Sequence, residues 1–155
     1  MPVIDTDPNV RAFLDMIAWS EGTPQIKGSD NGYNVTVGGG LFNSYADHPR
    51  RLVKLPRYGL SSTAAGRYQL LAKYYDAYKN LLDLPDFSPL SQDKIAIQQI
   101  KERKALPLIQ SGDIRGAIQR CANIWASLPG AGYGQHENPL NRLIAEYKSN
   151  GGSLA

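Results

Sequence analysis

The sequence has little of what metal, redox or nucleophilic sites require: it contains one cysteine, Cys121, and two histidines in 155 residues. A single thiol cannot form an intramolecular disulfide, so a reducing compartment is compatible with the fold. His48 and His136 supply too few ligands at useful spacing for a metal site. No Ser/His/Asp arrangement occurs, and the glycine-rich loops lack the Lys and Ser/Thr of a nucleotide site. We therefore expect no metal and no cofactor.

Long apolar runs are also missing. No stretch approaches the roughly 20 apolar residues that a membrane-spanning helix needs. Residues 1–7 carry two acids and no Lys or Arg, a pattern unlike that of a secretory signal peptide. The sequence thus predicts neither a membrane span nor a secretion signal.

A strong excess of one charge is absent as well, because 17 Lys and Arg residues stand against 14 Asp and Glu, for a net charge of +3. This mild basicity suits a polyanionic partner such as nucleic acid, a membrane surface or a bacterial cell wall. The basic residues are dispersed, and their nearest approach to a cluster is Arg50, Arg51, Lys54 and Arg57. Since no recognised nucleic-acid module is present, we expect no nucleic-acid partner and interpret this cluster as a solvated face.

What the chain does contain is the stretch Trp19-Ser20-Glu21-Gly22 at the end of a helical pattern. Val10, Leu14 and Ile17 define one apolar face of that helix, and Glu21 comes four residues later on the same face. A partly buried carboxyl at the negative end of the helix dipole has a raised pKa, as a general acid requires. The plainer alternative is a solvated Glu at a frayed helix end.

The order of patterns predicts an α+β fold. A helix is expected over Pro8–Glu21 with Asp7 as its N-cap, followed by a β-rich insert over about residues 30–58. Its expected strands are Tyr33–Val37, Leu41–Tyr45 and Leu52–Leu55. Further helices are expected to begin near Ser61–Thr63, at Ser88-Pro89, after Pro107, at Asp113 and at Asn138-Pro139. With 42% hydrophobic residues, the chain fits a single domain over 1–155.

Several longer runs resemble a known family. They are Ala12–Met16, Ala18–Thr23, Val37–Gly39, Asp47–Arg50, Gly66–Leu71, Phe87–Pro89 and the long block Asn123–Gln135. In this order and spacing they resemble the family of the bacteriophage lambda endolysin, which are lysozyme-like lytic transglycosylases, over nearly the whole chain. The resemblance implies a lysozyme-like fold, with a mainly helical lobe, a small antiparallel β lobe and the active-site cleft between them.

The resemblance also implies roles for individual residues. Glu21, in the Trp-Ser-Glu-Gly run, would be the catalytic acid. The run from Gly66 to Gln69 is similar to the Gly-x-x-Gln motif of lytic transglycosylases, which makes Gln69 a substrate-binding candidate. Tyr133 is the candidate for a loop tyrosine near the catalytic Glu. Trp19 and Tyr68 are candidate cleft walls, although core packing explains them at least as well.

The activity implied by the resemblance is cleavage of the β-1,4 bond between N-acetylmuramic acid and N-acetylglucosamine in peptidoglycan. A 1,6-anhydromuramic end would form without water. One alternative is a hydrolytic muramidase that pairs Glu21 with Asp30 or Asp47, although turn chemistry explains both aspartates. The family pattern has an acid where Asn34 stands here. A second alternative is a wall-binding module without activity.

The same resemblance implies partners and a place of action. The binding partner would be the glycan strands of peptidoglycan. We expect a monomer that remains in the host cytoplasm until a holin-type protein permeabilises the membrane. The protein would then reach the cell wall and lyse the bacterial host.

Overall fold

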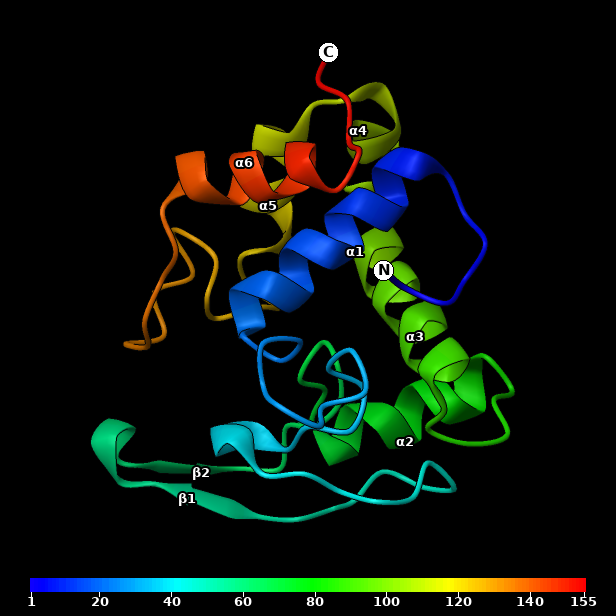
Figure 1. Cartoon of the computed structure of the whole chain (residues 1–155), viewed down its shortest axis with the longest axis vertical. Helices are drawn as coiled ribbons and strands as arrows, with labels where there is room; N and C mark the ends of the chain where they lie inside the picture. Colours follow the sequence, from blue (N-terminus) through cyan, green and yellow to red (C-terminus); the bar gives the residue numbers. More distant parts are fainter.

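Helix α1 (Pro8–Glu21) runs through the middle of the helical lobe (Figure 1). The computed structural model describes all 155 residues. Asp7 caps α1 by accepting hydrogen bonds from the backbone N–H groups of Asn9 and Val10, and Gly22 ends the helix in the left-handed conformation at φ 80°. Eight of the 14 helix residues are buried. The helix predicted over Pro8–Glu21 is therefore confirmed, with both of its ends.

Three shorter helices surround α1 on one side of the molecule, namely α4 (Leu106–Ser111), α5 (Ile114–Cys121) and α6 (Leu140–Ser149). Helix α1 packs against α4 and α6, and α5 packs against both α4 and α6. Together with part of α3 they enclose the larger hydrophobic core, of 21 buried residues. None of the helices in the chain is long and apolar enough to cross a membrane.

The starts of these helices follow the predicted signals with two adjustments. Asp113 caps α5 by accepting from the Gly116 N–H, as predicted. Helix α4 begins one residue before Pro107, which lies in the first turn, where its missing N–H is tolerated. Asn138 does not cap α6, because Pro139 takes the N-cap position without a side-chain bond.

On the other side lie α2 (Ala72–Leu81) and α3 (Pro89–Glu102), with Ser88 capping α3 as predicted. A second, smaller cluster of buried side chains forms here. In α2 the buried residue is Tyr75, whereas its neighbour Tyr74 is exposed. The helix predicted to begin near Ser61–Thr63 begins only at Ala72, because residues Leu60–Ser62 form a strand.

The β lobe contains one antiparallel hairpin, which extends along the lower edge of the molecule (Figure 1). Strand β1 (Val53–Leu55) pairs with β2 (Leu60–Ser62) across the short 3-10 helix η2 (Pro56–Tyr58). The small antiparallel sheet is thus confirmed, and the strand predicted over Leu52–Leu55 corresponds to β1.

The other two predicted strands, Tyr33–Val37 and Leu41–Tyr45, are wrong. The backbone there forms only isolated bridges, from Val35 to Leu41 and from Thr36 to Ala65. The 3-10 helix η1 (Val37–Gly39) interrupts the first segment, with Gly38 at φ 85°. A glycine in the left-handed region turns the chain before a ladder can extend.

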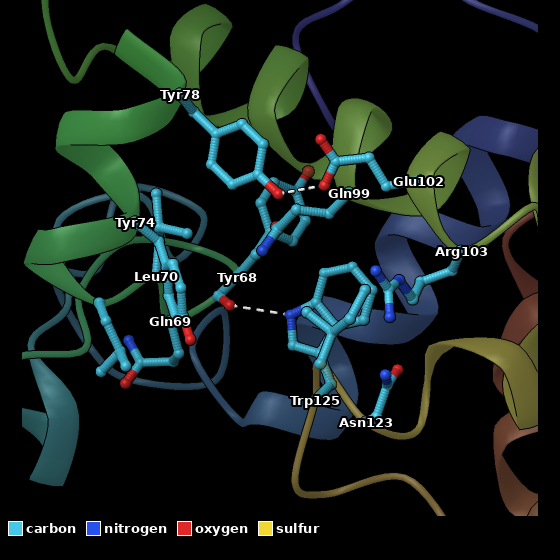
Figure 2. A pocket seen from close by; sticks show the side chains of 12 residues that line it. Tyr68, Gln69, Leu70, Tyr74, Tyr78, Gln99, Glu102, Arg103, Asn123 and Trp125 are labelled. Carbon is cyan, nitrogen blue, oxygen red and sulfur yellow. Dashed lines mark hydrogen bonds between the residues drawn. The ribbon is translucent and has the colours of Figure 1, made fainter. Parts of the chain in front are cut away.

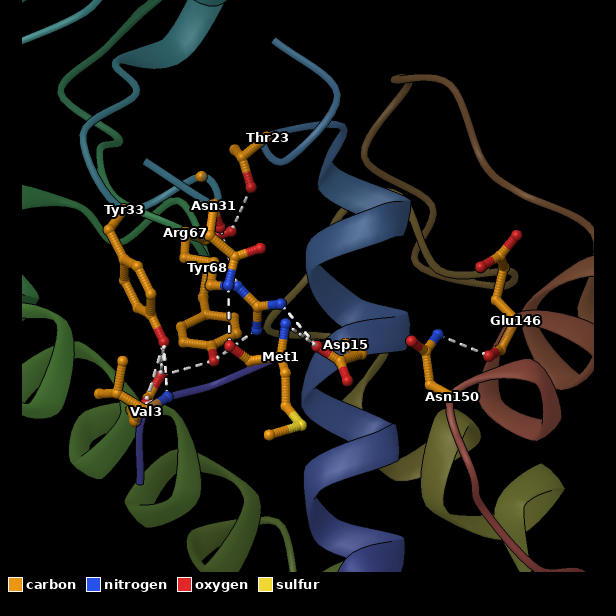
Figure 3. Close-up of polar contacts among 12 residues, drawn as sticks. Met1, Val3, Asp15, Thr23, Asn31, Tyr33, Arg67, Tyr68, Glu146 and Asn150 are labelled. Atoms are coloured by element: carbon orange, nitrogen blue, oxygen red, sulfur yellow. Dashed lines mark hydrogen bonds and ion pairs between the residues drawn. The ribbon is translucent and has the colours of Figure 1, made fainter. Parts of the chain in front are cut away.

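A buried polar network fixes the segment that links the two lobes (Figure 3). Arg67 is 1% exposed and donates to Asp15 of α1 at 2.6 Å and to the Tyr68 hydroxyl at 2.9 Å. Asp93 of α3 accepts from the hydroxyls of Tyr68 at 2.7 Å and Tyr33 at 2.9 Å. Because breaking a buried ion pair leaves an uncompensated charge, this network holds the chain around residue 67 firmly between α1 and α3.

Candidate active site

Glu21 is the last residue of α1, where the helix leaves the core and turns at Gly22 toward the β lobe. Its side chain is half-buried. Burial raises the pKa of Glu21 from 4.5 to about 7, and a hydrogen bond from Ser127 acts against that rise. A carboxyl that titrates near neutral pH can both donate and accept a proton there. The raised pKa expected from the sequence is confirmed, with burial as its main cause.

The Gly66–Gln69 run forms a tight turn beside the end of α1. Ala65 and Leu70 bridge its ends, and the Gln69 N–H donates to the Gly66 carbonyl at 3.2 Å. Gly66 has φ +86°, and a Cβ there would overlap the Gln92 side chain. Only glycine fits such a position. The hydroxyl of Thr23, two residues after Glu21, donates to the Arg67 carbonyl at 2.7 Å, which fastens the turn to α1.

Gln69 lies outside any helix, with a left-handed backbone at φ 54°, because α2 begins only at Ala72. Its amide nitrogen donates to the backbone carbonyls of Gly66 at 2.9 Å and Val35 at 3.3 Å. Those bonds fix the side chain and leave its carbonyl oxygen as an acceptor. Gln69 is thus a polar group whose side chain is held in place by the backbone around it.

A cavity of about 300 Å³ opens next to this turn (Figure 2). One wall is Tyr68–Leu71, and the opposite wall is Asn123–Trp125. The remaining lining residues are Tyr74, Tyr78, Gln99, Glu102 and Arg103. The Trp125 ring nitrogen donates to the Tyr68 carbonyl at 3.0 Å, so the two walls are joined at the base. Glu21 itself does not line the cavity; the hydrogen bond from Thr23 to the Arg67 carbonyl links the end of α1 to the wall that contains Tyr68.

The other sequence-predicted site residues lie in different surroundings. Tyr68 is 5% exposed, and its hydroxyl belongs to the buried network, so only part of the side chain faces the cavity. Trp19 is half-buried, with the Arg142 guanidinium 5.4 Å from its ring centroid. Tyr133 is 53% exposed, and its hydroxyl donates to the Asn123 carbonyl at 2.7 Å. Tyr68 and Gln69 line the same cavity, and Asn123, which binds the Tyr133 hydroxyl, lines it too. Trp19 lies elsewhere, against α6.

The two aspartates considered as partners of Glu21 are engaged elsewhere. Asp30 accepts a hydrogen bond from the Tyr45 hydroxyl at 2.5 Å. Asp47 pairs with Arg50 at 2.9 Å, and Arg50 holds its pKa below the usual range. No carboxylate contributes to the pKa shift of Glu21. The amide of Asn34 donates to the Gly28 carbonyl at 3.2 Å. No group of three or more His, Cys, Asp or Glu side chains is placed to hold a metal ion.

The sequence did not bring together three polar residues that hydrogen bond to one another beside the end of α1. They are Ser20, Ser127 and Asn138. Ser20 and Ser127 lie inside runs that carry the family resemblance, but 107 positions separate them along the chain. No local pattern could have paired them. Residues 123–125, which form a wall of the cavity, were missed for the same reason.

Comparisons with known proteins show which family the chain resembles. A family model described as "Endolysin" matches residues 11–154. The chain is 58% identical to the endolysin of Escherichia phage lambda over 155 residues, which covers 98% of this chain and 97% of that protein. It is 51% identical to the endolysin of Escherichia phage P2 over 162 residues, with 98% of both proteins covered.

Two solved structures of bacteriophage lambda lysozyme have a similar fold. A bacteriophage lambda lysozyme complexed with a chitohexasaccharide superposes with a TM-score of 0.93 at 57% identity, covering 99% of this chain and 100% of that one. A second structure of lysozyme from bacteriophage lambda has a TM-score of 0.89 at 56% identity, with the same coverage. The lysozyme-like α+β fold expected from the sequence is therefore confirmed.

Proposed function

The chain belongs to the endolysin family, and on this premise we propose that it is a peptidoglycan lytic transglycosylase. Its substrate is the β-1,4 bond between N-acetylmuramic acid and N-acetylglucosamine. Its product carries a 1,6-anhydromuramic end, and no water is consumed. The observation that carries the proposal is Glu21, a half-buried carboxyl with a pKa of about 7 and no carboxylate partner.

The chemistry needs one residue that acts twice. Protonated Glu21 first gives its proton to the glycosidic oxygen, and the bond from that oxygen to C1 of the muramyl sugar breaks. The ionised Glu21 then takes the proton of the C6 hydroxyl, whose oxygen bonds to C1 and closes the ring. Glu21 ends protonated, as it began. A pKa near neutral pH supports both steps, and the tethered hydroxyl gains from proximity.

A hydrolase of the usual kind needs a second carboxyl group close to the catalytic acid. A retaining glycosidase has its two carboxyl groups about 5–5.5 Å apart and an inverting one about 6.5–9.5 Å. Asp30 is bound by Tyr45 and Asp47 by Arg50, and neither perturbs Glu21. This supports the single-carboxylate route.

The cavity next to Gln69 supports binding of an extended glycan in the cleft. The complex of the related lambda lysozyme with a chitohexasaccharide points the same way. In this proposal the fixed carbonyl oxygen of Gln69 accepts a hydrogen bond from a sugar hydroxyl or acetamido group. Tyr133 and Trp19 contact the glycan strand from the loop and from α1, and Tyr68 forms part of the cavity wall.

The proposal includes a route to the substrate. Peptidoglycan lies outside the membrane of the host in which a phage protein is made. A holin-type partner would therefore permeabilise the membrane before the enzyme, acting as a monomer, reaches the wall and lyses the cell.

Mass spectrometry of the digestion products tests the mechanism. Sacculi digested in water enriched in heavy oxygen should yield muropeptides with 1,6-anhydro ends and no label. Each should be lighter by one water than the product of a known muramidase on the same sacculi. Labelled, reducible muramic acid ends would instead establish a hydrolase.

A further inference from the structure

One side of the cavity is formed by the end of α3, which contributes two polar residues one helical turn apart. Gln99 lies in the last turn of α3, and Arg103 is the residue that caps it. Their spacing of four residues places both on one face of the helix, roughly 5.4 Å apart along its axis. Both line the cavity, and Figure 2 shows Arg103 across it from Gln69.

The side-chain amide of Gln99 is a polar group without a partner. Gln99 is 8% exposed, and no hydrogen bond joins its side chain to the rest of the protein. The fully buried side-chain atoms that lack a partner are the Asn34 Oδ1 and the Tyr75 hydroxyl, so the Gln99 amide is reached through the cavity that it lines. An amide carries both donors and an acceptor. Gln99 can therefore pair with an amide of a ligand, donating to its carbonyl and accepting from its N–H.

Arg103 is a cation without an anionic partner. It takes part in none of the ion pairs of the chain. With the Asn123 amide turned so that both of its groups are satisfied, its oxygen accepts from an Arg103 guanidinium nitrogen at 2.8 Å and its nitrogen donates to the Arg120 carbonyl at 3.2 Å. This bond holds the guanidinium beside the Asn123 wall and leaves its other N–H groups for a carboxylate.

The neighbouring carboxylate, Glu102, is engaged by other residues. Its two oxygens accept hydrogen bonds from the Tyr78 hydroxyl and, at 3.3 Å, from the Gln98 amide nitrogen. Glu102 and Arg103 therefore line the same cavity without pairing with each other. The positive charge of Arg103 remains available to a ligand.

We propose that Gln99 and Arg103 bind the acidic peptide stem that muramic acid carries: Gln99 pairs with a backbone amide of the stem, and Arg103 binds a stem carboxylate. This inference rests on the proposed function, which makes peptidoglycan the substrate. An extended peptide advances about 3.3–3.6 Å per residue, so a carboxylate one or two residues beyond an amide matches one helical turn of about 5.4 Å. The two residues then favour glycan strands that carry stems.

The test compares glycan strands that carry peptide stems with the same strands after an amidase has removed the stems. Chromatography of the released products gives kcat/KM. The unaltered protein should favour the stem-bearing strands by about tenfold, the size of one hydrogen bond to a charged group. Arg103→Ala and Gln99→Met should each lose most of this preference through a higher KM, because they remove binding rather than chemistry. On stem-free strands each variant should stay within about twofold of the unaltered protein.

Lys101→Ala is the matched control. Lys101 has the same charge and lies in the same turn of α3, but it does not line the cavity, so its loss should leave both rates unchanged. Removing the stem leaves the lactyl carboxylate on the sugar. Equal losses by Arg103→Ala on both substrates would mean that Arg103 binds the sugar itself, which would overturn the inference, as would the absence of any stem preference in the unaltered protein. Anhydro ends on the products would in either case leave the proposed function standing.

Binding can also be read without turnover, in the Glu21→Gln variant. The side-chain amide of Gln99 gives an NMR signal that Gln99→Met identifies by its loss. A disaccharide that carries a stem should shift this signal, and the same disaccharide without the stem should leave it in place. Equal shifts with the two ligands would overturn the inference. The Tm of each variant, measured in parallel, shows that the fold is kept.

Discussion

The hydroxyl of Thr23 donates to the backbone carbonyl of Arg67 at 2.7 Å, across 44 positions of sequence. Thr23 follows Glu21, the proposed acid at the end of α1, by two residues, and Arg67 lies inside the turn that carries Gln69. The turn is also fixed by the ion pair of Arg67 with Asp15, at 2.6 Å. The end of α1 that carries the proposed acid is thus joined to the candidate substrate-binding turn, as catalysis by positioning requires.

Glu21→Gln should abolish lysis while the protein stays folded. The substitution keeps the size of the side chain and removes the transferable proton. We expect at least about a 100-fold loss in the rate of wall clearing, the scale of general acid–base catalysis. Glu146→Gln on α6 is the matched control and should clear at the normal rate. Near-normal clearing by the Glu21 variant would remove Glu21 from the mechanism.

The same variant should be more stable than the unaltered protein at neutral and higher pH. The pKa of Glu21 rises from 4.5 to about 7 on folding, so the folded state binds more protons than the unfolded state in that interval. Stability is therefore lost as pH rises from about 4.5 to about 7, and a neutral Gln escapes this loss. The difference in Tm between the two proteins should grow from pH 4 to pH 8. A difference independent of pH would contradict the burial of Glu21.

Asp30→Asn and Asp47→Asn should each retain substantial activity, because neither carboxylate is needed as nucleophile or base. Asp47→Asn weakens an exposed ion pair with Arg50, which is worth less than about 1 kcal/mol. Turbidity assays on wall material, with Tm measured in parallel, check both variants. Loss of activity as deep as that of Glu21→Gln, at unchanged Tm, would favour the two-carboxylate hydrolase.

Gly66→Ala should destabilise the protein and disturb the Gln69 turn. The backbone at Gly66 has φ +86°, and a Cβ would lie 2.9 Å from the Phe87 ring carbon Cζ. The left-handed strain alone costs about 1–3 kcal/mol, to which the overlap adds. Gly151→Ala is the control, because Gly151 has φ +92° with open space around it. Equal losses of unfolding free energy in the two variants would show that the overlap is relieved.

The lysis rate should fall with ionic strength. The net charge of +3 favours encounter with an anionic wall, and salt screens such attraction beyond about 10 Å at 0.1 M. Turbidity assays on wall material from low to high salt measure the effect, with the Tm measured at each salt concentration as the control for folding. A lysis rate on wall material that does not change with salt would show that electrostatic steering does not contribute.

Features with local causes could be predicted from the sequence. Asp7, Pro8 and Gly22 mark the two ends of α1 through capping and backbone preference, and the structure has the helix between them. Glu21 could be placed on its buried face by spacing alone. The resemblance supplied the lysozyme-like fold.

Features set by distant residues could not be predicted. The segment Tyr33–Val37 alternates like a strand, yet Val35 and Thr36 each find a bridge partner on a different segment, so no ladder grows. Leu60–Ser62 becomes a strand because β1 lies opposite, although its own residues favour a helix start. The contact of Asn138 with Ser20 spans 118 positions, beyond any local signal.

The order of these parts along the chain affects when the enzyme first becomes active during synthesis. Glu21 emerges early from the ribosome, but Ser127 and Asn138, which bind the neighbouring Ser20, and α6, which packs on α1, come much later. Contacts between such distant segments form only after the intervening chain is available. We therefore expect a nascent or truncated chain that ends before α6 to carry Glu21 without these contacts, and to become active only once α6 has packed on α1.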